Sequence, residues 1–298
     1  LDGAQVIAAT LVGTSNDILS NRKFRTVFID EAAQALEPAT WIPIARASRV
    51  IFMGDPYQLP PTVKSMKAGR EGLSITLIEK LLDRLPEVSL LDVQYRMNAH
   101  IMGFSNRVFY HGQLKAAPEV KSHRIGISAN HPVVFIDTAG CGFEEKVHPK
   151  YKSRYNPEEF LILREHLYQL KAAFPPEALP SVAIISPYRE QTVHIEQVIE
   201  EDPLLSGLPL AVNTIDGFQG QERDVVYISL VRSNAKGEIG FLKDYRRMNV
   251  AMTRARKQLI MAGDSATIGH DAFYSDFLAY CEQNGQYQSA WEYMRTTG

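Results

Sequence analysis

Thr26-Val-Phe-Ile-Asp-Glu31 is the stretch that decides the fold. Its centre, Val27–Ile29, is a short apolar run rich in β-formers, and two carboxylates follow it. Parallel α/β sheets bind ligands just beyond the carboxyl ends of their strands. Asp30 and Glu31 would therefore face a crevice, where one carboxylate holds Mg²⁺ and the other orients a water. An isolated Asp-Glu pair at a strand end is usually only solvated, so this interpretation depends on the motifs that follow.

Composition limits the classes to which the chain can belong. The 298 residues have 45% hydrophobic and 22% charged content, as in globular proteins, and the net charge of −2 does not indicate a general affinity for nucleic acid. Cys141 and Cys281 are the two cysteines, which argues against a disulfide framework or a zinc site and fits a reducing compartment. We expect a cytoplasmic protein, or a nuclear one in a eukaryote. Because the chain starts with Leu1 rather than Met, we expect it to be part of a longer protein.

Strands and helices alternate along the chain, which predicts an α/β fold with parallel sheets in two units that divide near residue 93. In the first unit we expect a β-compatible segment at Ala4–Val12, a helix starting at Glu37-Pro38 and a second strand at Val50–Met53. Ser74 is the expected cap of a helix in which leucines recur every four residues.

The second unit shows the same alternation. Its expected strands are Leu90–Val93, Val133–Ile136, Val182–Ile185, Ala211–Val212, Val225–Leu230 and Leu259–Ala262. We expect helices through Ile101–Val108, from Asn156-Pro157 onward and over Arg246–Arg256. Residues 111–130 and 140–154 are expected to be loops.

Two motifs combine unusual residues at the ends of expected strands. Gly54-Asp-Pro-Tyr-Gln-Leu-Pro-Pro61 is either a proline-stiffened loop or a loop that presents Gln58 to a phosphate or a water. Tyr95-Arg96 is either a core ring beside a surface charge or a ring that stacks on a base beside a guanidinium that binds phosphate.

Two further motifs lie near the end of the second unit. In Asn213-Thr-Ile-Asp-Gly-Phe-Gln-Gly-Gln-Glu222, the glycines Gly217 and Gly220 permit a close approach of backbone to a ligand. In the basic run that follows, most charges are expected to be solvated, and Arg254 is the best candidate for an arginine directed at phosphate.

Together these motifs resemble those of superfamily 1 helicases of the type typified by the nonsense-mediated-decay helicase and the immunoglobulin-mu-binding-protein helicase. Asp30-Glu-Ala-Ala is similar to motif II, Gly54–Pro61 to motif III, and Gln94-Tyr-Arg-Met to motif IV. Gly217-Phe-Gln-Gly-Gln-Glu is similar to motif V, and Asn249-Val-Ala-Met-Thr-Arg-Ala-Arg to motif VI.

The resemblance implies two RecA-like P-loop NTPase domains with ATP and Mg²⁺ between them. Residues 1–93 would be the C-terminal part of the first domain, which is incomplete here, and residues 94–298 the second domain. In the first domain, the resemblance implies that Asp30 binds Mg²⁺ through water, Glu31 activates the attacking water and Gln58 senses the γ-phosphate. In the second domain, it implies that Tyr95 stacks on the adenine, Glu222 binds the ribose and Gly220 lets the backbone approach the nucleotide closely. Arg96 and Arg254 would be arginine fingers.

The resemblance also implies movement in the 5′→3′ direction along single-stranded or forked nucleic acid. The contacts that it implies are Thr10, Thr14, Pro60, Pro187, Tyr188, Thr214 and Arg232. Because contacts to the backbone and base stacking occur with both polymers, the sequence does not decide whether the substrate is DNA or RNA. Pathway and oligomeric state are open as well.

The sequence departs from the family pattern at two places. Gln221 stands where the family often has a basic residue, and the 298 residues contain no Gly-x-x-x-x-Gly-Lys-Ser/Thr. We expect that phosphate-binding loop upstream in a longer helicase, and we expect these residues alone to be inactive toward ATP. The alternatives are a naturally truncated, non-catalytic nucleic-acid-binding module and an ATPase that remodels nucleoprotein without unwinding.

Overall fold

The computed structural model describes residues 3–82, 84–85, 88–126 and 131–294. The chain forms two compact units, Leu1–Leu90 (unit 1) and Leu91–Gly298 (unit 2). In the described residues, no helix has the length and apolar character that a membrane span needs.

Unit 1 is built on a two-stranded parallel sheet, in which β1 (Val27–Ile29) pairs with β2 (Val50–Phe52). Its other elements are η1 (Val12–Ser15), η2 (Asp17–Leu19), η3 (Ala32–Gln34), α1 (Glu37–Ile44), α2 (Met66–Ala68), η4 (Gly69–Leu73) and α3 (Leu77–Leu82). The β-compatible segment Ala4–Val12 does not form a strand: residues 4–10 pair with no strand, and a 3₁₀ turn starts at Val12.

The start of α3 also differs from the prediction. The Ser74 hydroxyl donates to the Gly69 carbonyl instead of capping the helix. Thr76 caps it: its hydroxyl accepts from the Glu79 N–H, and the Glu79 carboxylate accepts from the Thr76 N–H at 2.7 Å. This reciprocal pair is a capping box, whose Thr-x-x-Glu spacing is visible in the sequence.

Unit 2 contains a six-stranded, fully parallel sheet in the order β12-β5-β11-β10-β8-β9. Its strands are β5 (Val133–Asp137), β8 (Val182–Ser186), β9 (Leu210–Thr214), β10 (Arg223–Ser229), β11 (Ala255–Gly263) and β12 (Gln286–Ser289). The prediction of an α/β protein with parallel sheets is confirmed.

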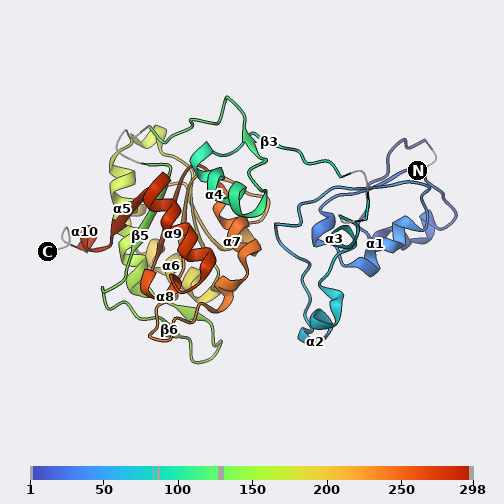
Figure 1. Ribbon diagram of the computed structural model, residues 1–298. Coiled ribbons are helices and arrows are strands. Elements are labelled where there is room, and N and C mark those ends of the chain that lie inside the picture. The colour runs from blue at the N-terminus through green and yellow to red at the C-terminus, as the bar shows by residue number, and fades with distance from the viewer. Residues whose placement is uncertain (1–2, 83, 86–87, 127–130, 295–298) are drawn as a thin grey trace. The chain divides into compact units, whose positions relative to one another are not determined.

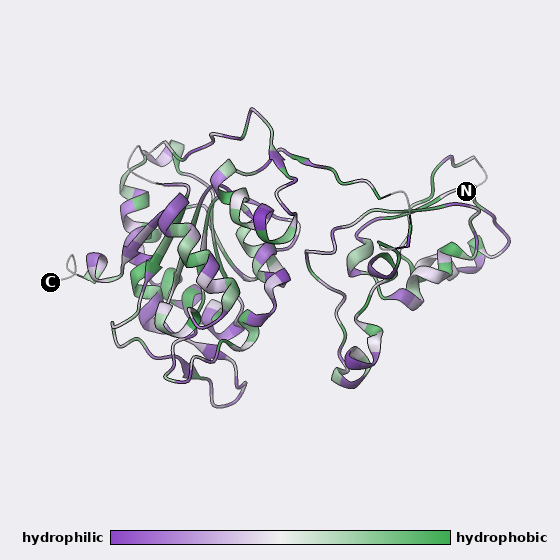
Figure 2. Cartoon of the chain, in the orientation of Figure 1, coloured by the Kyte–Doolittle hydropathy of each residue, from purple (hydrophilic) through white to green (hydrophobic). Residues whose placement is uncertain are grey.

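Helices cover both faces of this sheet (Figure 1). Because side chains alternate along a strand, Val134 and Ile136 of β5 pack on one face, whereas Phe135 contacts Phe277 on the other. The central strands are buried on both faces and are therefore continuously hydrophobic, as Figure 2 shows. The helices are α4 (Ala99–Phe109), α5 (Pro157–Ala172), α6 (Arg189–Glu200), α7 (Tyr245–Met252), α8 (Ser265–Ile268), α9 (Ala272–Asn284) and α10 (Trp291–Met294).

Several short elements correct the expected boundaries. The strand expected at Leu90–Val93 is β3 (Val93–Gln94), which pairs with β4 (Lys115–Ala116) inside the expected loop. Residues 127–130 of that loop lie outside the described part. The expected loop over residues 140–154 contains an antiparallel pair, β6 (Lys146–Val147) and β7 (Arg154–Tyr155). The helix expected over Arg246–Arg256 ends at Met252, because Ala255 already begins β11. The remaining elements are the 3₁₀ turns η5 (Pro176–Ala178), η6 (Pro203–Leu205), η7 (Asp216–Phe218) and η8 (Gly240–Lys243).

Candidate nucleotide and nucleic-acid sites

In unit 1 the predicted catalytic carboxylates follow β1, and the Gly54 motif follows β2. The parallel register pairs Ile29 with Phe52, so both turns lie at the same edge of the sheet. The Ala32 N–H donates to the Met53 carbonyl at 2.8 Å, which ties the two turns together. A Cβ at Gly54 would lie 2.9 Å from the backbone nitrogens of Ala32 and Ala33, so this close approach requires glycine.

Asp30 and Glu31 are both exposed at this edge. Glu31 has a left-handed backbone (φ 51°), and its carboxylate accepts from the Gln34 side chain at 2.7 Å. The Glu31 N–H donates to Asp30 at 3.0 Å. Within the described residues no three His, Cys, Asp or Glu side chains form a metal cage. Mg²⁺ commonly uses one or two carboxylates together with waters and phosphate oxygens, so a single exposed Asp30 fits this ion.

Gln58 lies in a loop that is held by Asp55. The Gln58 side chain donates to one Asp55 carboxylate oxygen at 2.8 Å, and the Tyr57 N–H donates to the other at 2.9 Å. These bonds hold the Gln58 side chain against Asp55 within the loop that follows β2. Its role as a phosphate sensor stays a prediction.

In unit 2 three charged side chains meet at the amino ends of β10 and β11. Arg96 Nε donates to Glu222 at 2.6 Å, and Arg96 Nη1 donates to the Thr253 carbonyl at 3.2 Å. Arg256 Nε lies 3.7 Å from the second Glu222 oxygen. We call Arg96, Glu222 and Arg256 the amino-edge cluster. Arg96 and Glu222 are partly exposed, with 34% and 42% of their side-chain surface accessible, so a ligand can reach this cluster.

Gln94 shapes the turn that carries Tyr95 and Arg96. Its side-chain oxygen accepts from the backbone N–H groups of Arg96 and Met97 at 2.8 and 2.7 Å, and its amide nitrogen donates to the Met97 carbonyl. The turn leaves Tyr95 72% exposed. An exposed ring beside a cation and a carboxylate has the polarity that a nucleoside needs.

Arg254 lies at the same edge, one residue before β11, but it is only 4% exposed. Its Nε donates to the Val250 carbonyl at 3.0 Å, and its own carbonyl accepts from the Arg223 N–H at 3.1 Å. The structure therefore places Arg254 behind the amino-edge cluster, and its role as an arginine finger stays a prediction.

The two predicted glycines lie in the segment between β9 and β10. Gly220 has φ +74°, a left-handed conformation that other residues rarely adopt. At Gly217 a Cβ would lie 2.1 Å from Asn213 Oδ1, so the chain passes tightly over that side chain.

The predicted nucleic-acid contacts of unit 2 lie at the opposite edge of the sheet. Pro187 and Tyr188 follow the carboxyl end of β8, Thr214 ends the neighbouring β9, and Arg232 follows β10. The amino-edge cluster and these residues are thus separated by the length of the strands. Pro187 and Thr214 are half-buried.

Tyr188 and Arg232, however, are buried beneath the surface, at 3% and 2% exposure. Arg232 Nε donates to Glu145 at 2.6 Å, and its Nη1 lies 3.5 Å from the Tyr188 hydroxyl. Burial lowers the pKa of the Arg232 guanidinium, but the hydrogen bonds with Tyr188 and Glu145 outweigh it and raise the pKa on balance. In this arrangement both side chains support the surface rather than form it.

The chain turns sharply just before Arg232. Val231 has φ +71°, and the Arg232 N–H donates back to the Leu230 carbonyl at 2.8 Å, which closes a three-residue turn. The buried Glu159 holds this turn, because its two oxygens accept from the Val231 N–H at 3.0 and 3.1 Å. Such backbone strain persists only where the surroundings impose it.

In unit 1 the expected nucleic-acid contacts lie on irregular segments. The Thr10 hydroxyl oxygen accepts from the Gly13 N–H at 3.0 Å, and the Thr14 hydroxyl donates to the Leu11 carbonyl. Thr10 is exposed, whereas Thr14 and Pro60 are half-buried. Both threonines therefore stabilise their own turn, and the contact roles of these three residues stay predictions.

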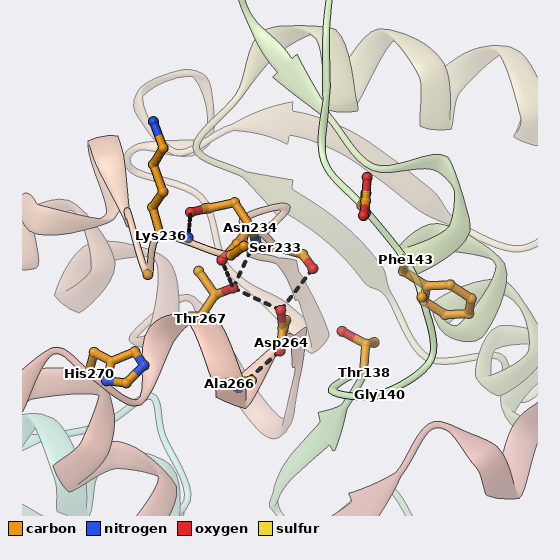
Figure 3. A pocket seen from close by; sticks show the side chains of 14 residues that line it. Thr138, Gly140, Phe143, Ser233, Asn234, Lys236, Asp264, Ala266, Thr267 and His270 are labelled. Atoms are coloured by element: carbon orange, nitrogen blue, oxygen red, sulfur yellow. Dashed lines mark hydrogen bonds between the residues drawn. The ribbon is translucent and has the colours of Figure 1, made fainter.

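A pocket of about 560 Å³ opens at the carboxyl ends of β5, β10 and β11. Figure 3 shows Asp264 at its centre, where the carboxylate accepts from the hydroxyls of Ser233 and Thr267 at 2.8 Å each. Lys236 extends away from this carboxylate. The polar groups at the centre are thus bonded mainly to one another.

Sequence reasoning missed four residues of these sites. Arg256 stands in the same Thr-Arg-Ala-Arg run as Arg254, so the sequence did carry a signal for it. Glu145 and Glu159 lie 87 and 72 residues from the groups that they bind, and no local pattern marks them. Phe241, exposed beside Tyr188, had the appearance of an ordinary apolar residue.

Comparisons with known proteins cover nearly the whole chain. Two family models, each described as "AAA domain", match residues 1–66 and 73–266. The DNA-binding protein SMUBP-2 of Mesocricetus auratus is 38% identical over 308 residues, which cover 99% of this chain and 30% of that protein. The DNA polymerase alpha-associated DNA helicase A of Saccharomyces cerevisiae is 34% identical, with 94% of this chain and 46% of that protein covered.

An uncharacterised ATP-dependent helicase of Methanocaldococcus jannaschii is 36% identical over 294 residues, which cover 94% of this chain and 42% of that protein. The chain therefore spans less than half the length of each of these relatives.

Proposed function

Since the chain belongs to the superfamily 1 helicases of the nonsense-mediated-decay and immunoglobulin-mu-binding-protein type, we propose that it is the C-terminal part of an ATP-dependent 5′→3′ helicase. Unit 1 would be the C-terminal part of the first RecA-like domain, and unit 2 would be the second domain. The complete protein would move along a single strand of DNA or RNA and use ATP with Mg²⁺.

The observation that carries this proposal is the amino-edge cluster together with the exposed Tyr95, which precedes Arg96 in the chain. Glu222 offers carboxylate oxygens to the ribose hydroxyls, Tyr95 offers an exposed ring to the base, and Arg96 offers a planar guanidinium to the phosphates. These three groups come from two segments 126 residues apart, which the fold brings together at one edge.

The amino-edge cluster also suggests how nucleotide binding would move the Arg96 guanidinium from Glu222 toward phosphate. Arg96 is now bonded to Glu222, the group that would accept from the ribose. A ribose hydroxyl that donates to Glu222 would compete with Arg96 for the same oxygen. The released guanidinium could then turn toward phosphate, where charge neutralisation accelerates phosphoryl transfer.

In unit 1 the carboxylates of Asp30 and Glu31 would have different roles in ATP hydrolysis. Asp30 would hold Mg²⁺ through water, and Glu31 would orient the attacking water. The ion supplies charge neutralisation at the phosphate oxygens. Because Glu31 is held by Gln34 and by its left-handed backbone, its carboxylate keeps a fixed direction next to Asp30.

Unwinding by the complete protein tests the proposal. We expect it to separate forked substrates that carry a 5′ single-stranded tail, with hydrolysis of ATP, and to leave substrates with a 3′ tail intact. Glu31→Gln should abolish unwinding and hydrolysis while retaining binding to the strand. Unwinding solely from a 3′ tail would contradict the direction, and strand binding without any hydrolysis would favour a non-catalytic module.

A further inference from the structure

Phe241 is an exposed aromatic ring on a firmly anchored turn of unit 2. Its side chain is 69% exposed, whereas Ile239 and Leu242 on either side are 2% and 1% exposed. The Leu242 carbonyl also accepts from the buried Tyr274 hydroxyl at 2.9 Å. The ring is therefore presented to solvent by a turn whose neighbours are fixed in the core.

The turn rests directly on Tyr188 and Arg232, two buried residues for which the family resemblance implies contact with nucleic acid. Gly240 has φ +56°, and a Cβ there would lie 2.0 Å from Arg232 Nη1 and 3.0 Å from the Tyr188 hydroxyl. The Phe241 N–H donates to the Tyr188 hydroxyl at 3.3 Å, and the two ring centroids are 5.6 Å apart. Phe241 thus covers Tyr188 and Arg232 at the carboxyl ends of β8 and β10.

Cations share the surface with this ring. A hollow of about 580 Å³ is lined by Phe241, Lys243 and Arg246, together with Phe109, Gly240, Asp244 and Tyr245. An aromatic face beside basic side chains is the surface on which proteins stack the bases and bind the phosphates of single strands.

Single exposed apolar residues are common and by themselves need no explanation. Three observations together distinguish Phe241: its fixed turn, its place over the Tyr188–Arg232 pair, and the two cations in its hollow. A protein partner would favour a broader apolar surface, whereas a ring beside cations fits a single strand.

We propose that Phe241 is a base-stacking residue in the path of the strand across unit 2, with Lys243 and Arg246 as its phosphate contacts. This inference rests on the proposed function. It also gives Tyr188 and Arg232 a place in that path: they are positioning residues that support the Phe241 turn from below.

Binding of labelled oligonucleotides to the 298-residue chain tests the inference. Fluorescence anisotropy should show that Phe241→Ala weakens binding to a single-stranded oligothymidylate roughly 5- to 150-fold, the range that follows from the loss of one base stack. Phe241→Trp should retain the affinity. Leu204→Ala is the matched control, because Leu204 is 62% exposed and precedes the amino end of β9; it should bind as the wild type does.

A backbone oligomer without bases separates stacking from charge. Wild type and Phe241→Ala should bind this abasic oligomer equally. If Phe241→Ala binds the base-bearing strand as tightly as wild type, or loses the same factor on the abasic strand, the stacking role is wrong and the proposed function stands. If the wild type binds neither oligomer, unit 2 provides no base-stacking site and the inference is wrong, whereas the proposed function concerns the complete protein and is decided by its unwinding activity.

Discussion

At the scale of single residues, Val231 shows how a strained backbone is maintained. A β-branched residue at φ +71° is an outlier, and its side chain is fully buried. The strain costs about 1–3 kcal/mol, and the hydrogen bonds that the Val231 N–H donates to the Glu159 carboxyl oxygens hold the turn in place.

This strain predicts an unusual order of stability. Val231→Ala and Val231→Gly both lose the buried side chain, but only glycine adopts a positive φ without strain. Elsewhere glycine is less stable than alanine by roughly 0.5–1 kcal/mol, whereas here we expect Val231→Gly to be at least as stable as Val231→Ala. Urea denaturation of the two variants measures the difference.

The comparison has an internal control at an ordinary position. Ala183 lies in β8, is fully buried and has no left-handed backbone, so Ala183→Gly should lose stability in the usual direction. If Val231→Gly is clearly less stable than Val231→Ala, the turn is not strained.

The sequence motifs singled out candidate residues, but they did not predict the surroundings of those residues. Arg96 and Glu222 come from two separate motifs, and the fold brings their side chains to 2.6 Å; their roles toward a nucleotide stay predictions. The burial of Tyr188 and Arg232 was not predictable, because it depends on Glu145 and on Gly240, which come from other parts of the chain. Whether a residue that follows a strand is exposed depends on which distant segments pack over it, and the local sequence does not show this.

At the scale of elements, α5 and β10 meet through Glu159. Asn156 caps α5 with its side chain, and Glu159 in the first turn accepts from the Ser229 hydroxyl at the end of β10. Burial raises the pKa of the Glu159 carboxyl to about 8, despite the opposing hydrogen bonds from Ser229 and Val231. The group is therefore mainly protonated at neutral pH.

The raised pKa predicts that stability falls as pH rises. The folded state retains a proton on Glu159 up to about pH 8, whereas the unfolded chain releases it near 4.5. Between these values the native state binds more protons, so the free energy of unfolding decreases by up to about 1.4 kcal/mol per pH unit. Burial lowers the pKa of His166 to about 4, which gives the opposite slope below its ordinary value of 6.5. The pH dependence due to Glu159 is therefore best measured between pH 6.5 and 8, where His166 contributes little.

Glu159→Gln provides the comparison, because the amide resembles the neutral acid in shape. Denaturant unfolding at several pH values in this window should show a decline for the wild type and a flatter profile for Glu159→Gln. Parallel slopes for the two proteins would show that Glu159 does not retain its proton in the folded state.

Local patterns predicted elements where the chain itself determines them. Asn156-Pro157-Glu158-Glu159 predicted the start of α5, and the helix begins at Pro157. β12 (Gln286–Ser289) escaped prediction, because its half-buried residues form no apolar run and it is a strand through pairing with β5. The Ala4–Val12 segment shows the converse, since β-compatible residues remain irregular without a partner strand.

At the scale of the whole molecule, the two units differ in the size of their cores. Unit 2 buries residues from the four inner strands of its sheet, β5, β8, β10 and β11, and from its helices. Unit 1 has a two-stranded sheet, and its strand residue Phe28 is 61% exposed. Small domains bury a smaller fraction of their surface and are correspondingly less stable.

We therefore expect the 298-residue chain to unfold in two steps, unit 1 first. Hydrogen exchange read by mass spectrometry should show lower protection in β1 and β2 than in β8 and β10 under the same conditions. The isolated residues 91–298 provide the control, because they should reproduce the second step alone. A single cooperative transition with equal protection in both units would contradict this expectation.

The segment between β9 and β10 is only slightly longer than the distance that it crosses from one edge of the sheet to the other. It leaves Thr214 at the carboxyl edge and reaches Arg223 at the amino edge, and Thr214 and the end of β10 are level because both flank β8. The Cα atoms of Thr214 and Arg223 must span about 22 Å, which combines roughly 20 Å along β10 with two strand spacings of about 4.8 Å across the sheet. The nine intervals between these atoms, three of them in a 3₁₀ turn, reach about 26 Å when the others are extended. The segment therefore allows a displacement of only a few ångströms, and a larger movement of Thr214 at one edge would also move Glu222 at the other.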